Sequence, residues 1–199
     1  MNFLAHIYLS GEDDKVKIGN FIGDHVKGRM FMMYPEKLRK GILMHRHIDT
    51  FTDHHPLVHK AKLIFAPKYG KYAGIIIDIL YDHYLARNWS EFSDIPLEEY
   101  VLNFHELLLQ NKEKLPLTIQ DFLPKLIASK RILSYQRTEG IEAVLSAMSK
   151  YTSLPDHTAF AMKMFKEHYD YLDLNFRNFM HEIIEFVETN HEIKILTKV

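Results

Sequence analysis

Residues that can bind a divalent metal are concentrated in the first half of the chain. Residues 45–59 read HRHIDTFTDHHPLVH and residues 78–83 read DILYDH, while His6 and Asp24 lie upstream of both. Only five of the thirteen histidines fall in the second half. Imidazole and carboxylate groups at helical spacing can hold a metal ion that activates water. We therefore expect the chemistry of this protein to lie in roughly the first 90 residues.

The first of these segments predicts a helix that presents polar groups on one face. His45, Asp49 and Asp53 follow each other at intervals of four residues, so they project from one stripe. His45 and Asp49 could share a metal, or one could bind it while the other orients a ligand. Arg46 lies on the neighbouring stripe, and its planar guanidinium suits phosphate oxygens. The alternative is a helix with solvated charges, which is the better interpretation for the remaining histidines taken singly: His47, His54, His55 and His59.

The second segment places acidic groups in apolar surroundings. Asp78 and Asp82 are also four residues apart, His83 follows directly, and isoleucine, leucine and tyrosine flank them. Burying an aspartate without a partner costs several kcal/mol, so these carboxylates must be paired, hydrogen-bonded or bound to metal. The alternatives to a metal site are a buried pair with an arginine and a helix edge that faces water.

Two further candidates precede these segments. Asp24 is expected near the C-terminal end of a helix, where the helix dipole disfavours a carboxylate, which suggests a metal or an arginine as its partner. His6 lies among Phe3, Leu4 and Ile7, and a single histidine on an apolar face is more often a core residue than a ligand.

Lysines and arginines group around the same segments. They could surround the mouth of a site and attract an acidic partner, or they could be ordinary solvated helix faces. The groups are Lys27 and Arg29; Lys37, Arg39 and Lys40; and Lys60, Lys62, Lys68 and Lys71.

Helical periodicity dominates the chain, and strict alternation of apolar and polar residues is scarce. The pattern predicts an all-α helical bundle, in which side chains of facing helices build ligand sites. The expected helices are 2–9, about 15–26, from Pro35 to Pro56, roughly 57–65, from after Gly70 to Trp89, from Pro96 onward, about 118–132, about 138–150, and a final helix or pair from Pro155 onward.

Length and composition indicate an ordinary globular protein. We expect a single domain over residues 1–199, with the site in 1–90 and helices that complete the fold in 91–199. A net charge of −1 argues against general attraction to nucleic acid, and the absence of cysteine excludes disulfides and thiolate metal sites. The N-terminus lacks the pattern of a signal peptide, and no apolar stretch is long enough to span a membrane, so we expect a cytoplasmic protein.

Four ordered motifs resemble the acyl carrier protein phosphodiesterase family. They are MNFLAH at the start, GNFIGDHVKG at 19–28, GILMHRHIDTFTDHHP at 41–56 and DILYDHYLARNW at 78–89. The resemblance implies an all-α, HD-domain-like fold, because this family is described as a divergent relative of the HD-type phosphohydrolases. It also implies removal of the 4′-phosphopantetheine arm from holo acyl carrier protein, with manganese or magnesium.

Carried over residue by residue, the motifs place their functional positions at His6, Asp24, His45, Arg46, Asp49, Thr52, Asp53, Asp78, Asp82 and His83. The chain departs from the family pattern in a few places. These are the additional histidines His47, His54 and His55, Tyr84 where phenylalanine is usual, and His25.

The resulting hypothesis is a metal-dependent phosphodiester hydrolase. The candidate ligands are His6, Asp24, His45, Asp49, Asp78, Asp82 and His83. The candidate catalytic residues are Asp24, Arg46, Asp49, Asp82 and His83. Hard oxygen ligands favour Mn²⁺ or Mg²⁺. We expect holo acyl carrier protein as the partner and neither nucleic acid nor membrane. The alternatives are a related phosphohydrolase of a nucleotide or other small phosphoester, and a helical module that binds a carrier protein without turnover.

Overall fold

The structure is a computed structural model that describes residues 1–196. Within this range the regular elements are helices and no strand occurs, which confirms the all-α prediction. The α-helices are α1 (Phe3–Tyr8), α2 (Asp14–Phe21), α3 (Glu36–His54), α4 (Pro56–Tyr69), α5 (Ala73–Arg87), α6 (Trp89–Phe92), α7 (Leu97–Gln110), α8 (Leu117–Ala128), α9 (Arg131–Ser134), α10 (Thr138–Tyr151), α11 (Thr158–Glu167) and α12 (Tyr169–His191). Short 3₁₀ helices are η1 (Gly23–His25), η2 (Met30–Met33), η3 (Gly70–Tyr72) and η4 (Lys112–Lys114).

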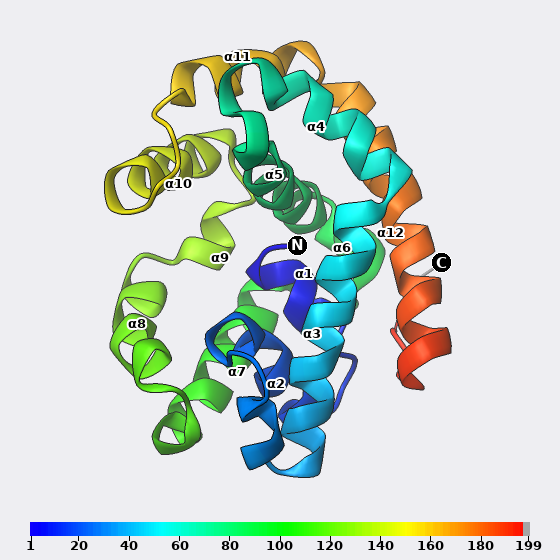
Figure 1. The fold of residues 1–199 in the computed structure, drawn as a ribbon, viewed down its shortest axis with the longest axis vertical. Helices are drawn as coiled ribbons and strands as arrows, with labels where there is room; N and C mark the ends of the chain where they lie inside the picture. Colours follow the sequence, from blue (N-terminus) through cyan, green and yellow to red (C-terminus); the bar gives the residue numbers. More distant parts are fainter. Residues whose placement is uncertain (197–199) are drawn as a thin grey trace.

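Helix α3 runs from the lower end of the molecule to about its middle and meets α2 on one side and α12 on another (Figure 1). Two glycines allow the backbones of α2 and α3 to touch. A Cβ atom on Gly19 would collide with the carbonyl oxygen of Leu38, and one on Gly41 would collide with that of Val16. This close approach holds the start of α3 against the segment that leads to Asp24.

Two helix boundaries differ from those expected. The second helix ends at Phe21 instead of continuing to about Val26, because the chain tightens into η1, where the amide of Val26 donates to the carbonyl of Gly23. The fourth helix continues to Tyr69, with Pro67 inside it, and ends at Gly70, whose φ of 50° favours glycine. The final segment is a pair of helices, α11 and α12, that begins at Thr158.

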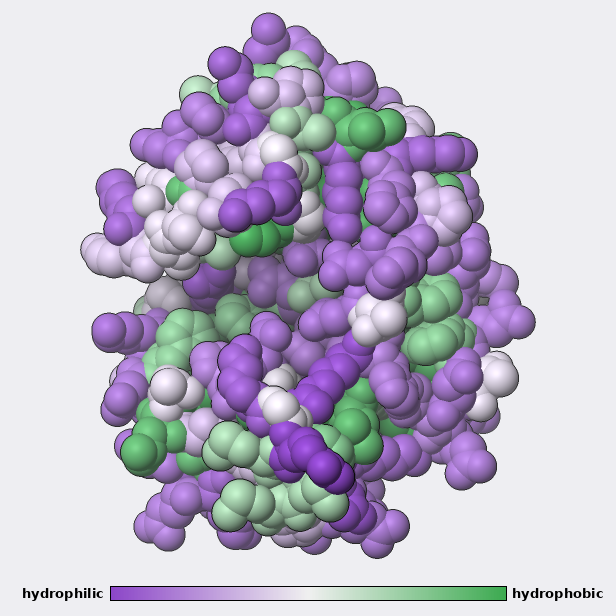
Figure 2. Space-filling model, in the orientation of Figure 1, coloured by the Kyte–Doolittle hydropathy of each residue, from purple (hydrophilic) through white to green (hydrophobic). Residues whose placement is uncertain are grey.

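The short helix α1 lies in the middle of the molecule. It packs against α2 and α5, and its residues from Leu4 to Tyr8 are buried in one hydrophobic core to which the helices on every side contribute. Figure 2 shows a hollow in the surface over the start of α1, between α10 and α8. Among the described helices, none has both the length and the apolarity needed to cross a membrane.

Candidate metal centre

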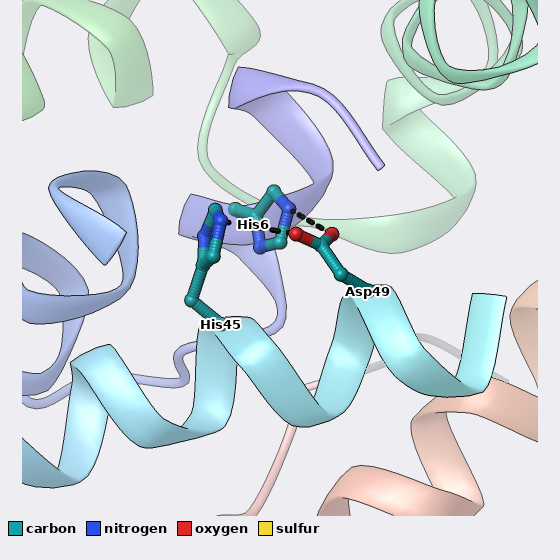
Figure 3. A group of neighbouring side chains, drawn as sticks. All are labelled: His6, His45 and Asp49. Atoms are coloured by element: carbon teal, nitrogen blue, oxygen red, sulfur yellow. Dashed lines mark ion pairs between the residues drawn. The ribbon is translucent and has the colours of Figure 1, made fainter. Parts of the chain in front are cut away.

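Three of the predicted ligands meet between α1 and α3 (Figure 3). His6 projects from α1, and His45 and Asp49 point toward it from successive turns of α3. Nε2 of His6 lies 3.2 Å from Oδ1 of Asp49, and Nε2 of His45 lies 3.1 Å from Oδ2 of the same carboxylate. The two imidazole rings stack, with their centroids 4.0 Å apart. One carboxylate therefore faces two imidazole nitrogens that belong to different helices.

Asn20 determines which nitrogen of His6 carries a proton. The Asn20 amide nitrogen donates to the carbonyl oxygen of His6 and to the Ser10 hydroxyl, so its Oδ1 is the atom that faces the imidazole. That oxygen lies 2.8 Å from Nδ1 of His6 and can only accept, so in the neutral ring the proton is on Nδ1. Nε2 then presents a lone pair to the carboxylate of Asp49. Metal-binding histidines show this arrangement, with the remote N–H donated to an oxygen.

Three buried ring nitrogens of the two histidines lack hydrogen-bond partners. Nε2 of His6 and both ring nitrogens of His45 are enclosed, and their contacts to carboxylates do not have hydrogen-bond geometry. Buried polar atoms are nearly always satisfied, so each exception needs an explanation. A divalent cation bound by His6, His45 and Asp49 would take up Nε2 of His6 and one nitrogen of His45, and one ligand atom from each of the three residues lies within 4.8 Å of the others. The residues present therefore fit a metal.

Asp24 borders this group next to His45. Its Oδ1 lies 3.2 Å from Nε2 of His45, and its side chain is 76% exposed. The carboxylate stands in η1 and not on a helix end, because the chain turns immediately before it at Gly23. A Cβ atom on Gly23 would collide with the His45 ring, so glycine lets this turn lie directly against the imidazole. Together with Met1, Asn2, Phe3, Phe21 and His25, these side chains line a small pocket of about 40 Å³.

The charges of the group depend on one another. Burial, together with the neighbouring His45, lowers the pKa of His6 to about 4. Burial also opposes protonation of His45, but its contacts with Asp24 and Asp49 prevail and raise its pKa to about 9. Burial would raise the pKa of Asp49, but the two imidazoles together hold it well below its usual range. The ionised carboxylate of Asp49 is the form that binds a metal, and His45 would release its proton when it binds one.

Asp78 lies beside the group, on the far side of Asp49. The α-ammonium of Met1 is 3.1 Å from Oδ1 of Asp78 and 3.4 Å from Oδ1 of Asp49. Asp78 thus contributes negative charge close to Asp49, and in this structure its partner is a cation of the chain itself.

Asp82 does not join the group. Both of its oxygens accept backbone N–H groups of α1, with Oδ2 2.8 Å from the amide nitrogen of Leu4 and Oδ1 3.0 Å from that of Ala5. The side chain is fully buried, and burial raises its pKa to about 7. The carboxylate therefore caps the first turn of the helix that carries His6, which is the hydrogen-bonded alternative to a metal ligand.

His83 also points away from the group. Its Nδ1 is 2.6 Å from the carbonyl oxygen of Tyr135 and its Nε2 is 3.1 Å from the Tyr169 hydroxyl. Since the carbonyl can only accept, Nδ1 carries the proton and the hydroxyl donates to Nε2. Burial lowers the pKa of His83 below 6.5. His83 thus joins α5 to the distal half of the chain as a neutral imidazole.

This neutral state predicts a pH dependence of stability. Below about pH 6.5, the ordinary pKa of a free imidazole, the unfolded chain binds a proton that folded His83 does not, so acid lowers the free energy of unfolding. Between about pH 7.5 and about pH 5.5, we expect the wild-type protein to lose more unfolding free energy than His83→Gln, by at most about 1.4 kcal/mol per pH unit. Urea unfolding of both proteins at the two pH values measures the difference. Equal losses would show that His83 is not the residue responsible.

The remaining predicted residues have other contacts. Arg46 donates to the carbonyl oxygen of Val26 at 2.6 Å and stacks over the ring of Phe31, so it ties the loop after Asp24 to α3. Asp53 is on the surface, where it pairs with Lys62, and the Thr52 hydroxyl donates to the carbonyl of Ile48 in its own helix. The surrounding histidines have partners outside the group: His47 with His191, His54 with the Thr50 carbonyl, and His55 with Glu182.

Sequence reasoning did not identify Asn20, Ser10 or Gly23 as parts of the site. Asn20 and Gly23 lie in the GNFIGDHVKG motif. Asn20 directly precedes the apolar pair Phe21 and Ile22, and a polar residue in that position of a helix was the signal that could have identified it. For Ser10 we see no such signal. Their roles depend on contacts between α1, α2 and α3, and the spacing of residues within one helix does not predict such contacts.

The comparisons with known proteins agree with one another. The family model described as "Acyl carrier protein phosphodiesterase" matches residues 1–183. A protein of that name from Enterobacter sp. (strain 638) is 32% identical over 90% of this chain and 93% of its own length. A protein of the same name from Klebsiella pneumoniae (strain 342) is 30% identical over 94% of this chain and 98% of its own length. One from Yersinia pestis is 30% identical over 90% of this chain and 93% of its own length. No solved structure matches the chain.

Proposed function

This chain belongs to the acyl carrier protein phosphodiesterase family, and on that premise we propose the bond that it hydrolyses. The substrate is holo acyl carrier protein, and the bond is the phosphodiester between a serine of that protein and 4′-phosphopantetheine. The products are the apo carrier protein and free 4′-phosphopantetheine. The observation that carries the proposal is the Asp49 carboxylate facing Nε2 of both His6 and His45, with Asn20 fixing the tautomer of His6.

We assign the metal to His6, His45 and Asp49, with Asp24 as a fourth ligand at the open side. When bound, Mn²⁺ or Mg²⁺ would polarise a phosphate oxygen and lower the pKa of a water molecule. The other contributions come from the chain. Asn20 orients His6, and Asp82 holds the helix that carries it. The exposure of Asp24 leaves the group accessible from the surface.

The surface beside Asp24 suits an acidic protein partner. Between Asp24 and Glu36 the chain has no acidic residue, and Lys27 and Arg29 are exposed there. Three methionines of the same loop are also exposed: Met30 by 56%, Met32 by 55% and Met33 by 83%. Flexible methionine side chains flanked by positive charge are common at surfaces that bind other proteins. In Figure 2 this loop forms the pale green area near the bottom, beside strongly hydrophilic atoms.

Electrostatic attraction of this kind predicts that the rate depends on salt. We expect kcat/KM for holo acyl carrier protein to fall several-fold between about 50 mM and about 500 mM NaCl. A double variant, Lys27→Ala with Arg29→Ala, should lower kcat/KM at low salt and flatten this dependence. The matched control is Lys163→Ala with Lys166→Ala on α11, at the opposite end of the molecule (Figure 1). A control that flattens the dependence equally would refute a local docking surface.

Intact-mass spectrometry of holo acyl carrier protein tests the reaction directly. With the protein and Mn²⁺ we expect loss of the 4′-phosphopantetheine mass, and we expect no change with EDTA or with Asp24→Ala. If the folded, metal-loaded protein leaves the carrier intact, the assignment of this substrate is wrong. Hydrolysis of a small phosphoester under the same conditions would then identify the protein as a phosphohydrolase of small molecules, and binding of the carrier without turnover would identify a non-catalytic module.

A further inference from the structure

Arg131 is a half-buried arginine without a carboxylate partner. It opens the short helix α9, and in the described part of the chain no carboxylate lies within ion-pair distance of its guanidinium. Its Nε donates to the Tyr135 hydroxyl at 3.2 Å, and its Nη2 meets only the Met148 sulfur, at 3.5 Å. The guanidinium lies 5.4 Å from the centroid of the Phe3 ring. Sulfur is a weak acceptor, so the outer N–H groups of this half-buried guanidinium can still bind the oxygens of a ligand.

Two of the three contacts of Arg131, those with Phe3 and Tyr135, lead to the pocket beside the metal ligands. Phe3 and Asn2 line that pocket together with His6, Asp24 and His45. The Asn2 amide donates to the Tyr135 hydroxyl at 2.8 Å, the same hydroxyl that Arg131 contacts. Arg131 therefore contacts one lining residue directly, through Phe3, and reaches a second, Asn2, through the Tyr135 hydroxyl. The hollow over the start of α1 in Figure 2 lies on this side, where Figure 1 places α9.

Two other arginines have stronger structural partners. Arg46 is engaged by the Val26 carbonyl and the Phe31 ring, and Arg177 pairs with Glu91 and Asp173. Arg46 thus holds the loop that carries Asp24, whereas Nη2 of Arg131 contacts a sulfur atom. The five N–H donors of an arginine match phosphate oxygens in a planar, bidentate geometry.

We infer that Arg131 binds the phosphodiester anion of the substrate at the mouth of the candidate metal centre. The inference rests on the proposed function for the identity of the anion, but binding of a phosphate group can be measured without turnover. The stack on Phe3 and the bond to Tyr135 hold the guanidinium at the pocket edge, and the donors that face Met148 can turn to phosphate oxygens. The distal half of the chain then contributes a residue to a site whose ligands all lie in the first half.

Three variants test this inference. Arg131→Met removes the charge and keeps an unbranched apolar side chain, Arg131→Lys keeps a point charge, and Arg137→Met is the control at a neighbouring exposed arginine. The first measurement is the melting temperature of metal-free protein in inorganic phosphate against chloride of equal ionic strength. We expect phosphate to raise the Tm of the wild-type protein and of Arg137→Met, and to leave Arg131→Met unchanged. An equal rise in all proteins would overturn the inference.

Turnover of holo acyl carrier protein supplies the second measurement. Arg131→Met should lower kcat/KM on the order of 10²-fold, as expected when a donor to the reacting phosphate is lost, and Arg137→Met should not. The kcat/KM of Arg131→Lys should lie between those of Arg131→Met and Arg137→Met, because an ammonium lacks the planar pair of donors with which a guanidinium binds two oxygens. If Arg131→Met does not fold, the rise of Tm in phosphate is compared between Arg131→Lys and the wild-type protein. A smaller rise in Arg131→Lys supports the inference, and an equal rise overturns it. If the wild-type protein does not hydrolyse the carrier, the proposed function fails while the phosphate measurement still decides the role of Arg131.

Discussion

Asp49→Asn is expected to lower kcat/KM roughly 10³-fold, because a metal supplies several kcal/mol to such a reaction and about 1.4 kcal/mol corresponds to a factor of ten. Within residues 1–196, Asp49 is the one carboxylate that faces both His6 and His45. An amide at this position has no negative charge and offers one oxygen where the carboxylate offers two. The two imidazoles would then lack the anion that draws a cation between them.

The same variant should lose its response to metal. Mn²⁺ at about 100 times its dissociation constant stabilises a folded protein by about 2.7 kcal/mol, so wild-type Tm should rise on addition of the ion. The control is Asp53→Asn, one turn further along α3, whose carboxylate pairs with Lys62 at the surface. We expect Asp53→Asn to keep both activity and the Mn²⁺ response. Retention of the Mn²⁺ response by Asp49→Asn would place the metal elsewhere.

Asp82→Ala is expected to have the largest effect on stability. The substitution leaves the amide groups of Leu4 and Ala5 buried without acceptors, and each costs about 1–3 kcal/mol, so the free energy of unfolding should fall by roughly 2–6 kcal/mol. Asp82→Asn keeps one acceptor, so its free energy of unfolding should lie between those of the wild-type protein and Asp82→Ala. Urea unfolding measures all three. We also expect weaker Mn²⁺ binding, since α1 carries His6.

Asp13 provides a matched comparison for Asp82. It caps α2 through the amides of Lys15 and Val16, but it does so near the surface, where water can replace it. We expect Asp13→Ala to cost only about 1 kcal/mol. If Asp82→Ala is no more destabilising than Asp13→Ala, the buried capping role of Asp82 is wrong.

Local spacing was sufficient to predict the helical fold and one half of the candidate site. His45 and Asp49 are four residues apart on α3, and helix geometry alone places them on one face, whatever the helix packs against. The apolar periodicity likewise determines that the described chain is helical. Helix ends were predicted less well: α2 stops before Asp24 because η1 forms, which depends on Gly23 meeting His45.

Tertiary structure alone decided which polar residues meet. In the sequence, Asp82 has the same spacing and surroundings as a metal ligand, but its carboxylate faces the amides of α1. A buried carboxylate can be satisfied by a metal, a cation or backbone N–H groups, and the local sequence does not distinguish among them. His6 and Arg131 show the reverse. His6 has the pattern of a core residue and Arg131 lies far along the chain. Packing nevertheless brings His6 into the pocket and Arg131 onto the ring of Phe3, which lines it, because contacts between helices depend on their relative placement and not on spacing along either one.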